Sequence, residues 1–297
     1  MPHVTVCICT FKRPQFLKRL LQELGRQETG NQFSYSVLVT DNDRMESARA
    51  VVMEYAKDLP IPIQYLVEPR QNIALARNTA VENAQGDYIV FIDDDEFPTP
   101  SWLMTMVNTC AKYDVDGVLG PVKPWFEHEP PKWVVRGKFH ERPTYPTGLV
   151  IDWRKGRTGN TFLKKGLFTP GQQHFRPEFL TGEDQDFFRR TIEKGHRFVW
   201  CNEAVAYEIV PAERCKRSFM LRRALLRGKV SLEHPDMGAP QVLKSAIAIM
   251  IYSIALPFLF LIGHHWFMKY LVKTCDHAGR ILAFVGSKPT GSTYVSQ

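Results

Sequence analysis

Apolar residues in the first 120 positions fall into two alternating patterns. Short runs rich in β-branched residues predict buried strands at 4–9, 36–40, 63–67 and 88–92. Between these runs, apolar residues recur at helical spacing over 14–24, 48–56, 73–84 and 100–111. This strand–helix alternation with short connections predicts an α/β fold, a mostly parallel sheet with helices on both faces.

The periodic pattern disappears between 121 and 179, where prolines, glycines and aromatic residues dominate. An irregular stretch of this length inside a compact domain is usually functional, so we expect acceptor recognition here. Its aromatic residues either stack on a sugar or pack in a core. A helix over 181–193 and short strands at 196–200 and 204–209 follow. The chain therefore divides into 1–120, 121–210 and 211–297, and we expect the first two segments to be halves of one domain.

Charge and hydropathy change together in the last segment. Residues 211–230 contain seven Lys or Arg and one acid, which is +6 of the net +7. A basic amphipathic helix beside an anionic membrane explains this charge better than nucleic-acid binding, because no nucleic-acid motif accompanies it. The 19 residues from 245 to 263 carry no charge and would extend roughly 28 Å as a helix, close to the thickness of a bilayer core. Pro257 leaves open whether they span, re-enter or pack as a core helix.

The overall composition narrows the class of protein. Hydrophobic residues make up 44% and charged residues 23% of the 297 positions, which excludes a disordered chain and a polytopic membrane protein. Six cysteines occur without a CxxC pair, so we expect no zinc site and no disulfide framework, in a reducing cytosolic setting. The N-terminus lacks the pattern of a signal peptide.

The strongest chemical signal is the acidic run that follows the fourth predicted strand. Asp93 and Asp95 lie on the same side of an extended chain, and like charges at that distance repel unless a cation lies between them. Oxygen ligands of this kind suit Mg²⁺ or Mn²⁺. The alternative is a solvated acidic turn, but the end of a buried strand, where such sheets bind ligands, favours the metal.

Two further groups of polar residues stand at predicted helix starts. Glu183 and Asp184 begin one helix, where the helix dipole alone favours acids and where a general base could equally lie. Arg77, in the helix after the third strand, is either a surface residue or a partner for Asp41 or a phosphate.

Five motifs in order resemble the family 2 glycosyltransferases, which have a GT-A fold. They are CICTFKRP, VTDND, the ARN helix, FIDDDE and TGEDQDFFRR, and the resemblance covers about residues 3–230. The stretch YEIVPAERCKRSFMLRRALLRG is similar to the bacterial exopolysaccharide glucosyltransferases of the succinoglycan type.

The resemblance implies a role for each matching residue. Asp184 would be the catalytic base, and the metal would bind Asp95, Asp93 and Glu208, which stands where many relatives have a histidine. The nucleotide-sugar pocket would comprise Thr10, Phe11, Arg13, Asp41, Arg77, Asp93 and Asp94.

The resemblance also implies an activity. We expect an inverting glycosyltransferase that uses Mn²⁺ or Mg²⁺ and transfers a sugar from UDP-glucose or another UDP-hexose to a lipid-linked saccharide. Its place would be the cytoplasmic face of the inner membrane, in surface or exopolysaccharide synthesis, with no nucleic-acid partner. The alternatives are a synthase that transfers the sugar directly to polyprenyl phosphate, and a catalytically silent membrane-bound module of the same fold.

Overall fold

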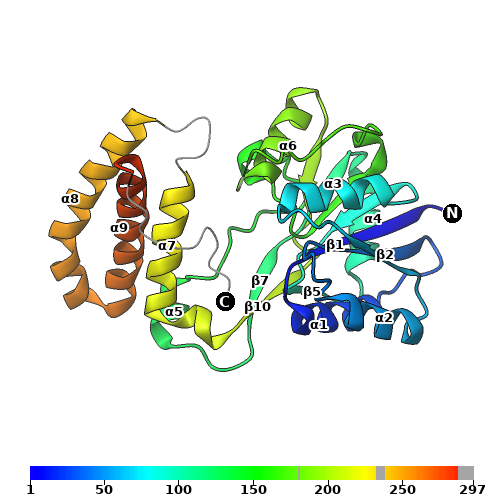
Figure 1. Cartoon of the computed structure of the whole chain (residues 1–297), viewed down its shortest axis with the longest axis horizontal. Helices are drawn as coiled ribbons and strands as arrows, with labels where there is room; N and C mark the ends of the chain where they lie inside the picture. The colour runs from blue at the N-terminus through cyan, green and yellow to red at the C-terminus, as the bar shows by residue number, and fades with distance from the viewer. Residues whose placement is uncertain (180, 232–237, 287–297) are drawn as a thin grey trace. The chain divides into compact units, whose positions relative to one another are not determined.

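The computed structural model describes residues 1–179, 181–231 and 238–286, and these form two compact units (Figure 1). Unit 1 consists of Met1–Pro124, Arg142–Glu178 and Gly182–Ile209. Unit 2 consists of Trp125–Glu141, Phe179–Thr181 and Val210–Gln297, as far as these segments are described. The sequence predicted three segments, 1–120, 121–210 and 211–297, according to their expected functions. That functional division stays a prediction.

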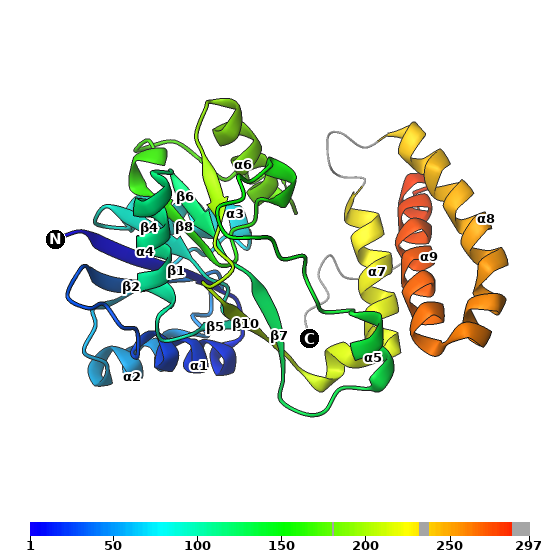
Figure 2. The same cartoon turned by 180° about the vertical axis from the view of Figure 1, so that it is seen from behind.

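Unit 1 is built on a seven-stranded sheet with the order β3-β2-β1-β4-β8-β6-β9 (Figure 2). Its strands are β1 (His3–Thr10), β2 (Ser34–Asp41), β3 (Ile63–Val67), β4 (Tyr88–Phe91), β6 (Gly117–Leu119), β8 (Thr161–Lys164) and β9 (Phe198–Trp200). Only β8 runs antiparallel to its neighbours, β4 and β6. The mostly parallel α/β sheet is confirmed.

The sequence patterns predicted the short strands β4 and β9 but not β6 or β8. The stretch from 121 to 179 was expected to be irregular, and that expectation is wrong at Val122–Phe126, Lys132–Gly137 and Thr161–Lys164, which form two strands and a helix. In β8 only two apolar residues lie between a threonine and a lysine, too few to show a period. Two short 3₁₀ turns, η1 (Trp153–Lys155) and η2 (Lys165–Leu167), flank it.

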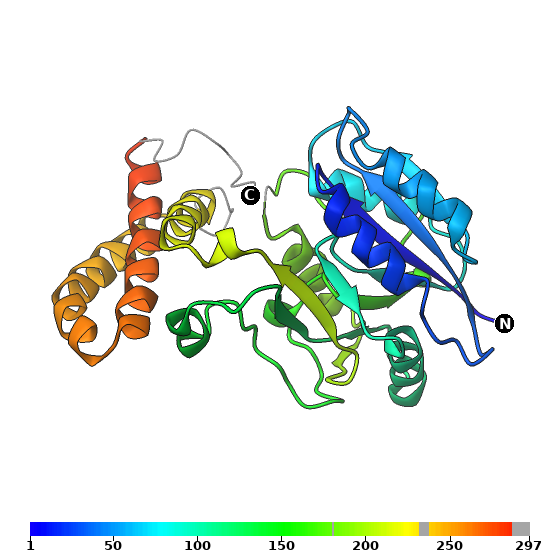
Figure 3. The same ribbon diagram turned by 90° about the horizontal axis from the view of Figure 1, so that it is seen from below.

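Helices cover both faces of the sheet. One face carries α1 (Pro14–Leu24), α2 (Arg49–Asp58) and α4 (Trp102–Tyr113), and the other carries α3 (Ile73–Asn83) and α6 (Glu183–Glu193). Helices α1 and α2, drawn in blue, lie side by side (Figures 1 and 3).

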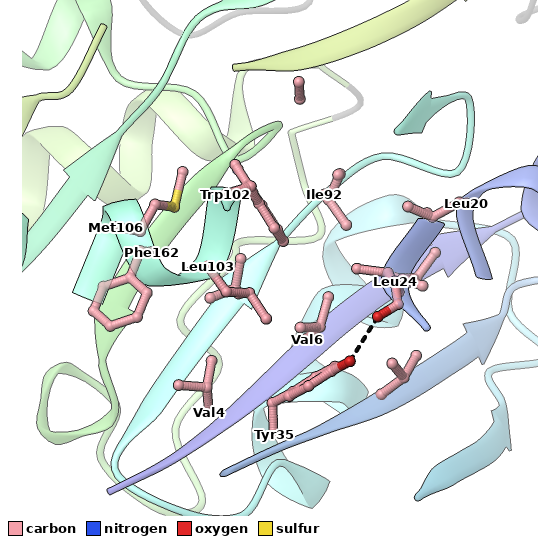
Figure 4. Close-up of a cluster of buried hydrophobic side chains, with 14 of the residues drawn as sticks. Val4, Val6, Leu20, Leu24, Tyr35, Ile92, Trp102, Leu103, Met106 and Phe162 are labelled. Atoms are coloured by element: carbon pink, nitrogen blue, oxygen red, sulfur yellow. Dashed lines mark hydrogen bonds between the residues drawn. The ribbon is translucent and has the colours of Figure 1, made fainter. Parts of the chain in front are cut away.

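Alternation along β1 supplies both cores. Val4, Val6 and Ile8 pack with α1 and α4, whereas Cys7 packs on the opposite face. In the first core, shown in Figure 4, Trp102 is fully buried and the Tyr35 hydroxyl donates to the Leu24 carbonyl at 2.7 Å.

A second sheet of three strands has the order β5-β10-β7. Its strands are β5 (Glu96–Pro98), β10 (Ala206–Val210) and β7 (Val122–Phe126). In the antiparallel pair of β5 and β10, Glu96 lies directly opposite Glu208. Two carboxylates in this register repel each other, so a cation is needed near them.

The described part of unit 2 is helical. It contains α5 (Lys132–Gly137), the 3₁₀ turn η3 (Ala212–Cys215), α7 (Arg217–Ser231), α8 (Ala239–Ile262) and α9 (His264–Phe284). Helix α9 lies between α7 and α8 (Figures 1 and 2). A Cβ on Gly228 would lie 1.9 Å from the Asp276 carbonyl oxygen, and one on Gly279 would lie 2.0 Å from that of Leu225. The backbones of α7 and α9 therefore touch at two glycines.

Helix α8 exposes most of its apolar side chains. Its most hydrophobic 18-residue window has a mean hydropathy of 2.3 and is 6% buried, and α8 alone among the described helices is long and apolar enough to cross a membrane. It begins at Ala239, earlier than the uncharged stretch predicted, and Pro257 lies inside it without ending it. Such low burial argues against the core-helix interpretation.

Polar contacts join α7, α8 and α9 of unit 2. Ser245 of α8 is fully buried and its hydroxyl contacts Arg280 at 2.9 Å and His277 at 3.0 Å. Asp276 accepts from Arg227 of α7 at 2.6 Å. Polar groups thus lie between the helices beside aromatic pairs such as Tyr252 with Tyr270, and other large apolar side chains lie exposed on α8.

Candidate active site

The carboxyl ends of β1, β2 and β4 meet at one edge of the sheet. Thr10, at the end of β1, lies opposite Asp41 at the end of β2, and the Asn42 amide donates to the Thr10 carbonyl at 2.8 Å. The acidic run begins two residues after β4, and the Thr10 hydroxyl donates to Asp94 Oδ2 at 2.8 Å. The ends of these strands therefore form one polar site.

Arg13 bridges two carboxylates of this site. Its Nη1 lies 3.3 Å from Asp94 Oδ1 and 3.3 Å from Asp95 Oδ2. Burial raises the pKa of Asp94 to about 7, while Arg13 and the Thr10 hydroxyl act in the opposite direction. Phe11 is partly exposed next to this pair, with the Lys12 ammonium 5.1 Å from its ring centroid.

Asp41 is buried and organises the loop that follows β2. Its carboxylate accepts from the Ala48 amide at 2.8 Å, the Asp43 amide at 3.0 Å and the Tyr65 hydroxyl at 2.9 Å. These bonds fix the backbone between β2 and α2 beside Thr10. The predicted contact of Asp41 with a base or ribose stays a prediction.

Helix α3 positions Arg77 and the loop across from it. Asn72 caps α3, its side chain accepting from the Ala74 and Leu75 amides. The Asn78 side chain donates to the Phe175 carbonyl at 2.7 Å and accepts from the Phe175 amide at 2.9 Å. This segment, which was predicted to be irregular, is therefore attached to α3, and its Phe175 packs against Phe187 of α6.

Arg77 is buried and makes an ion pair with Glu183 at the start of α6. Its Nη2 also lies 3.9 Å from Asp93 Oδ1. Burial lowers the pKa of Arg77, but Glu183 and Asp93 more than compensate, so the guanidinium stays charged. Of the two partners that the sequence left open for Arg77, Asp41 makes no direct contact with it.

Asp184 differs from its neighbour. Glu183 is 5% exposed and is engaged by Arg77, whereas Asp184 is only partly buried. One oxygen of Asp184 accepts from the Gln185 amide at 2.8 Å. Asp184 is therefore the member of the acidic pair that a substrate hydroxyl can reach.

A third arginine, Arg142, separates the facing acids of the small sheet. Its Nη2 lies 2.5 Å from Glu208 Oε2 and its Nη1 lies 3.8 Å from Glu96 Oε1. Glu96 is 1% exposed, and burial together with nearby Asp93 raises its pKa well above the usual range. Neither Glu96 nor Arg142 was among the predicted site residues.

The carboxylates are of the type that binds a divalent cation, but in this structure they are paired with arginines. Within 1–179, 181–231 and 238–286, no three His, Cys, Asp or Glu side chains are arranged to hold a metal. However, a Cβ on Gly159 would lie 3.0 Å from Asp93 Oδ2 and 3.1 Å from Glu96 Oε1, so these two oxygens converge. All the donors are carboxylate oxygens, which Mg²⁺ and Mn²⁺ prefer. A cation bound by Asp93, Asp95 and Glu208 would take over the charge that Arg13 and Arg142 now balance.

Several residues of the site had little signal in the sequence. Glu96 directly follows the acidic run and could have been found, but Arg142 and Gly159 lie in the aperiodic stretch. Together with Arg157 they line a small cavity of about 50 Å³. Burial, then Arg142, lowers the pKa of Arg157. Only the tertiary contacts identify these residues.

Sequence comparison places the chain among known proteins. Residues 5–178 match the family described as Glycosyl transferase family 2. The chain is 31% identical to the succinoglycan biosynthesis protein ExoM of Rhizobium meliloti over 76% of its own length and 73% of that protein.

Structural comparison agrees on the fold. A mannosyltransferase from Pyrobaculum calidifontis, solved with GDP-Man and Mn²⁺, matches with a TM-score of 0.62 at 16% identity, over 97% of this chain and 88% of that one. Residues 1–349 of TarS from S. aureus, solved with UDP-GlcNAc, match with a TM-score of 0.56 at 14% identity, over 97% and 93% of the two chains. At these identities the likeness shows the fold alone, a GT-A-like α/β fold.

Proposed function

The chain belongs to glycosyl transferase family 2, and we propose that it is a metal-dependent, inverting enzyme that transfers a hexose from a UDP-sugar to a lipid-linked saccharide. The observation that carries the proposal is the placement of Asp184. It is the accessible acid beside a group of buried carboxylates and arginines at the carboxyl edge of the sheet. This edge is where open α/β sheets bind their ligands.

The chemistry assigned to this site is a single displacement. Asp184 accepts the proton of an acceptor hydroxyl, whose oxygen forms a bond to the anomeric carbon. The bond from that carbon to the nucleoside diphosphate breaks on the opposite face, so the anomeric configuration inverts. Asp184 lies close enough to Arg77 and Arg157 to act upward on the pKa of both guanidinium groups, so the proposed base has two cations near it.

We assign binding of the nucleotide-sugar donor to the other predicted site residues. Arg13 and Thr10 hold Asp94 and Asp95 at the edge where a nucleotide would lie, and Asp41 fixes the loop beside it. A bound Mn²⁺ or Mg²⁺, held by Asp93, Asp95 and Glu208, would neutralise the charge that develops on the diphosphate leaving group. The UDP-GlcNAc and GDP-Man of the two structural neighbours make a nucleotide sugar the fitting class of donor, and the sequence resemblance favours UDP-glucose.

We also propose attachment to the cytoplasmic face of the membrane. The exposed apolar surface of α8 and the basic residues of α7 support it. A lipid-linked acceptor would then be held at the surface where the enzyme works.

The decisive experiment is a calorimetric titration of the full chain with UDP and GDP, in Mn²⁺ and in EDTA. We expect UDP to bind in a metal-dependent way, Asp95→Ala to abolish this binding and Asp184→Ala to preserve it. Preference for GDP would overturn the UDP-sugar donor. Absence of nucleotide binding and of donor hydrolysis would favour the catalytically silent module.

The acceptor is tested separately. With donor supplied, polyprenyl phosphate and a lipid-linked saccharide are compared as acceptors. Transfer to the saccharide supports the proposal, and transfer only to the lipid phosphate would establish the synthase alternative.

A further inference from the structure

Unit 2 contains a cavity of about 710 Å³, separate from the polar edge of the sheet in unit 1. This volume lies in the range of small-molecule sites. The residues that line it come from the end of β7, the start of α5, η3 and the start of α7, all of them in unit 2.

The inner wall of the cavity is apolar. Val210 and Cys215 are buried, and Phe126 and Trp133 pack against the same apolar cluster. Only the Trp133 indole N–H and, weakly, the Cys215 thiol could donate a hydrogen bond from this wall. A wall of this kind is suited to a hydrocarbon chain.

The exposed rim of the cavity is polar and carries two cations. Lys216 and Arg217 are positively charged and Glu129 is negatively charged, and the Lys216 ammonium lies 3.6 Å from Glu213 Oε1, which is outside the lining. Phe126 of the wall packs edge-on against the His140 ring at 5.9 Å between centroids. Burial, then Arg223 and Arg214, lowers the pKa of His140 to about 4. The combination of apolar wall and cationic rim matches a molecule with a chain and an anionic head.

The apolar wall continues to the tip of the α8–α9 hairpin. Trp133 packs edge-on against His264, the first residue of α9, at 5.6 Å between ring centroids. Gly263 precedes His264, and before it Leu261 and Ile262 end α8 and are 82% and 69% exposed. A chain in the cavity would therefore meet the same apolar surface that we assign to the membrane.

We propose that this cavity binds the apolar chain of a phosphate-bearing lipid, with the phosphate beside Lys216 and Arg217. The inference rests on the proposed function, because it names the part of a lipid-linked acceptor that unit 2 would hold. Free phosphate would leave the apolar wall unused, and an uncharged lipid would leave the cationic rim unused.

The test is calorimetric titration of the detergent-solubilised full chain with three probes: farnesyl phosphate, farnesol and inorganic phosphate. We expect farnesyl phosphate to bind at least tenfold more tightly than farnesol, and inorganic phosphate to show no saturable binding. Equal binding of farnesol and farnesyl phosphate would overturn the inference, as would saturable binding of inorganic phosphate alone.

Two variants distinguish binding in the cavity from partition of the lipid into detergent micelles. Micelle partition should be the same for wild type and variants. Ala212 is exposed and lines the cavity, so Ala212→Trp should fill it and abolish binding of farnesyl phosphate. Val135 is exposed on α5 outside the lining, and Val135→Trp should leave binding unchanged. Similar binding by wild type and Ala212→Trp would contradict the proposed site.

The phosphate contact has its own matched pair of variants. Lys216→Gln with Arg217→Gln should weaken farnesyl phosphate at least tenfold and leave farnesol unchanged. Arg136→Gln with Lys138→Gln removes the same charge from exposed positions of unit 2 outside the lining and should change neither. An equal loss of affinity for farnesyl phosphate in both double variants would overturn the proposed site, because it would show that the net charge of the protein alone attracts the lipid phosphate.

A UDP titration of the same samples distinguishes this inference from the proposed function. UDP binding without a lipid effect would overturn the lipid site and leave the transferase intact. Binding of farnesyl phosphate without nucleotide binding would overturn the transferase and leave the lipid site intact.

Discussion

The two units place their large apolar side chains in opposite ways. In unit 1, these side chains lie inside, and the 9% exposed Arg77 is paired with carboxylates. In unit 2, Arg227 is also paired with a carboxylate, that of Asp276, but Ile254 and Phe258 of α8 are 67% and 65% exposed. Buried ion pairs are stable only where each charge is balanced, and exposed apolar surface of this extent marks an interaction face. Unit 1 therefore gathers balanced charges at one edge of its sheet, whereas unit 2 exposes an apolar face on α8.

The sharpest test of unit 1 is Asp184→Asn, which removes the proposed base and preserves its shape. Turnover should fall about 10²–10⁴-fold, with UDP binding unchanged, when transfer is measured at saturating donor. Glu193→Gln, at the exposed far end of the same helix, is the control and should retain full turnover. A loss of less than tenfold in Asp184→Asn would remove Asp184 from the base role.

Unit 2 is tested by placing charge on the exposed face of α8. Ile254→Lys with Phe258→Lys should reduce partition into vesicles of phosphatidylcholine and phosphatidylglycerol by about 10²-fold. Because both side chains are exposed, the free energy of unfolding should change by no more than about 0.5 kcal/mol. Flotation with vesicles measures the first effect and chemical denaturation the second. Met53→Lys on α2 of unit 1 is the control, and equal loss of flotation there would contradict the assigned face.

Gly159→Ala tests whether the converging carboxylates of Asp93 and Glu96 take part in metal-dependent UDP binding. The new Cβ would lie 3.0 Å from Asp93 Oδ2 and 3.1 Å from Glu96 Oε1, so both must shift. Metal-dependent UDP binding should weaken by about tenfold, roughly 1.4 kcal/mol. Gly166→Ala, where a Cβ meets nothing within 4 Å, should bind UDP as wild type does. Unchanged UDP binding in Gly159→Ala would exclude these oxygens from the nucleotide site.

Gly279→Ala tests the contact between α7 and α9. A Cβ there would lie 2.0 Å from the Leu225 carbonyl oxygen. Overpacking should destabilise by about 3 kcal/mol, the upper end of its usual range, because the neighbour is backbone. Helix propensity offsets about 1 kcal/mol of this, which leaves a net loss of roughly 2 kcal/mol. Proteolysis should detect opening of unit 2 while UDP binding by unit 1 persists. Unchanged resistance of unit 2 to proteolysis would refute the close contact.

The smallest expected effect is the pH dependence of unit 2 through His140. Its folded-state pKa of about 4, lowered by burial and then by Arg223 and Arg214, is below the ordinary value of about 6.5. The unfolded state therefore binds more protons between these values, and stability falls as the pH falls from about 6.5 to 4. His140→Gln should reduce the loss of melting temperature between pH 7 and pH 5. His128→Gln, at an exposed histidine, should match wild type, and an equal change in both variants would contradict the assignment.

The patterns that the sequence predicted well are those with enough residues to show a period. The alternation of β1, α1, β2, α2, β3, α3 and β4 was confirmed because uninterrupted apolar runs and helices of ten or more residues carry their own signal. The strands β5, β6, β7 and β8 gave no such signal, because proline, glycine or charged residues interrupt their apolar runs of three to five residues. They form because neighbouring strands offer unpaired backbone groups.

For the site, the sequence by itself determined the residue types and the edge at which they meet. It predicted the acidic run after β4, the pair Glu183 and Asp184, and Arg77. The tertiary structure decided the pairing: Arg77 engages Glu183 and leaves Asp184 accessible, and Arg142 separates Glu96 from Glu208. Likewise, composition revealed that α8 is apolar, but packing against α9 decided which side chains stay exposed. The physical reason is that periodicity and composition are properties of neighbours along the chain, whereas charge pairing and burial depend on groups that only folding brings together.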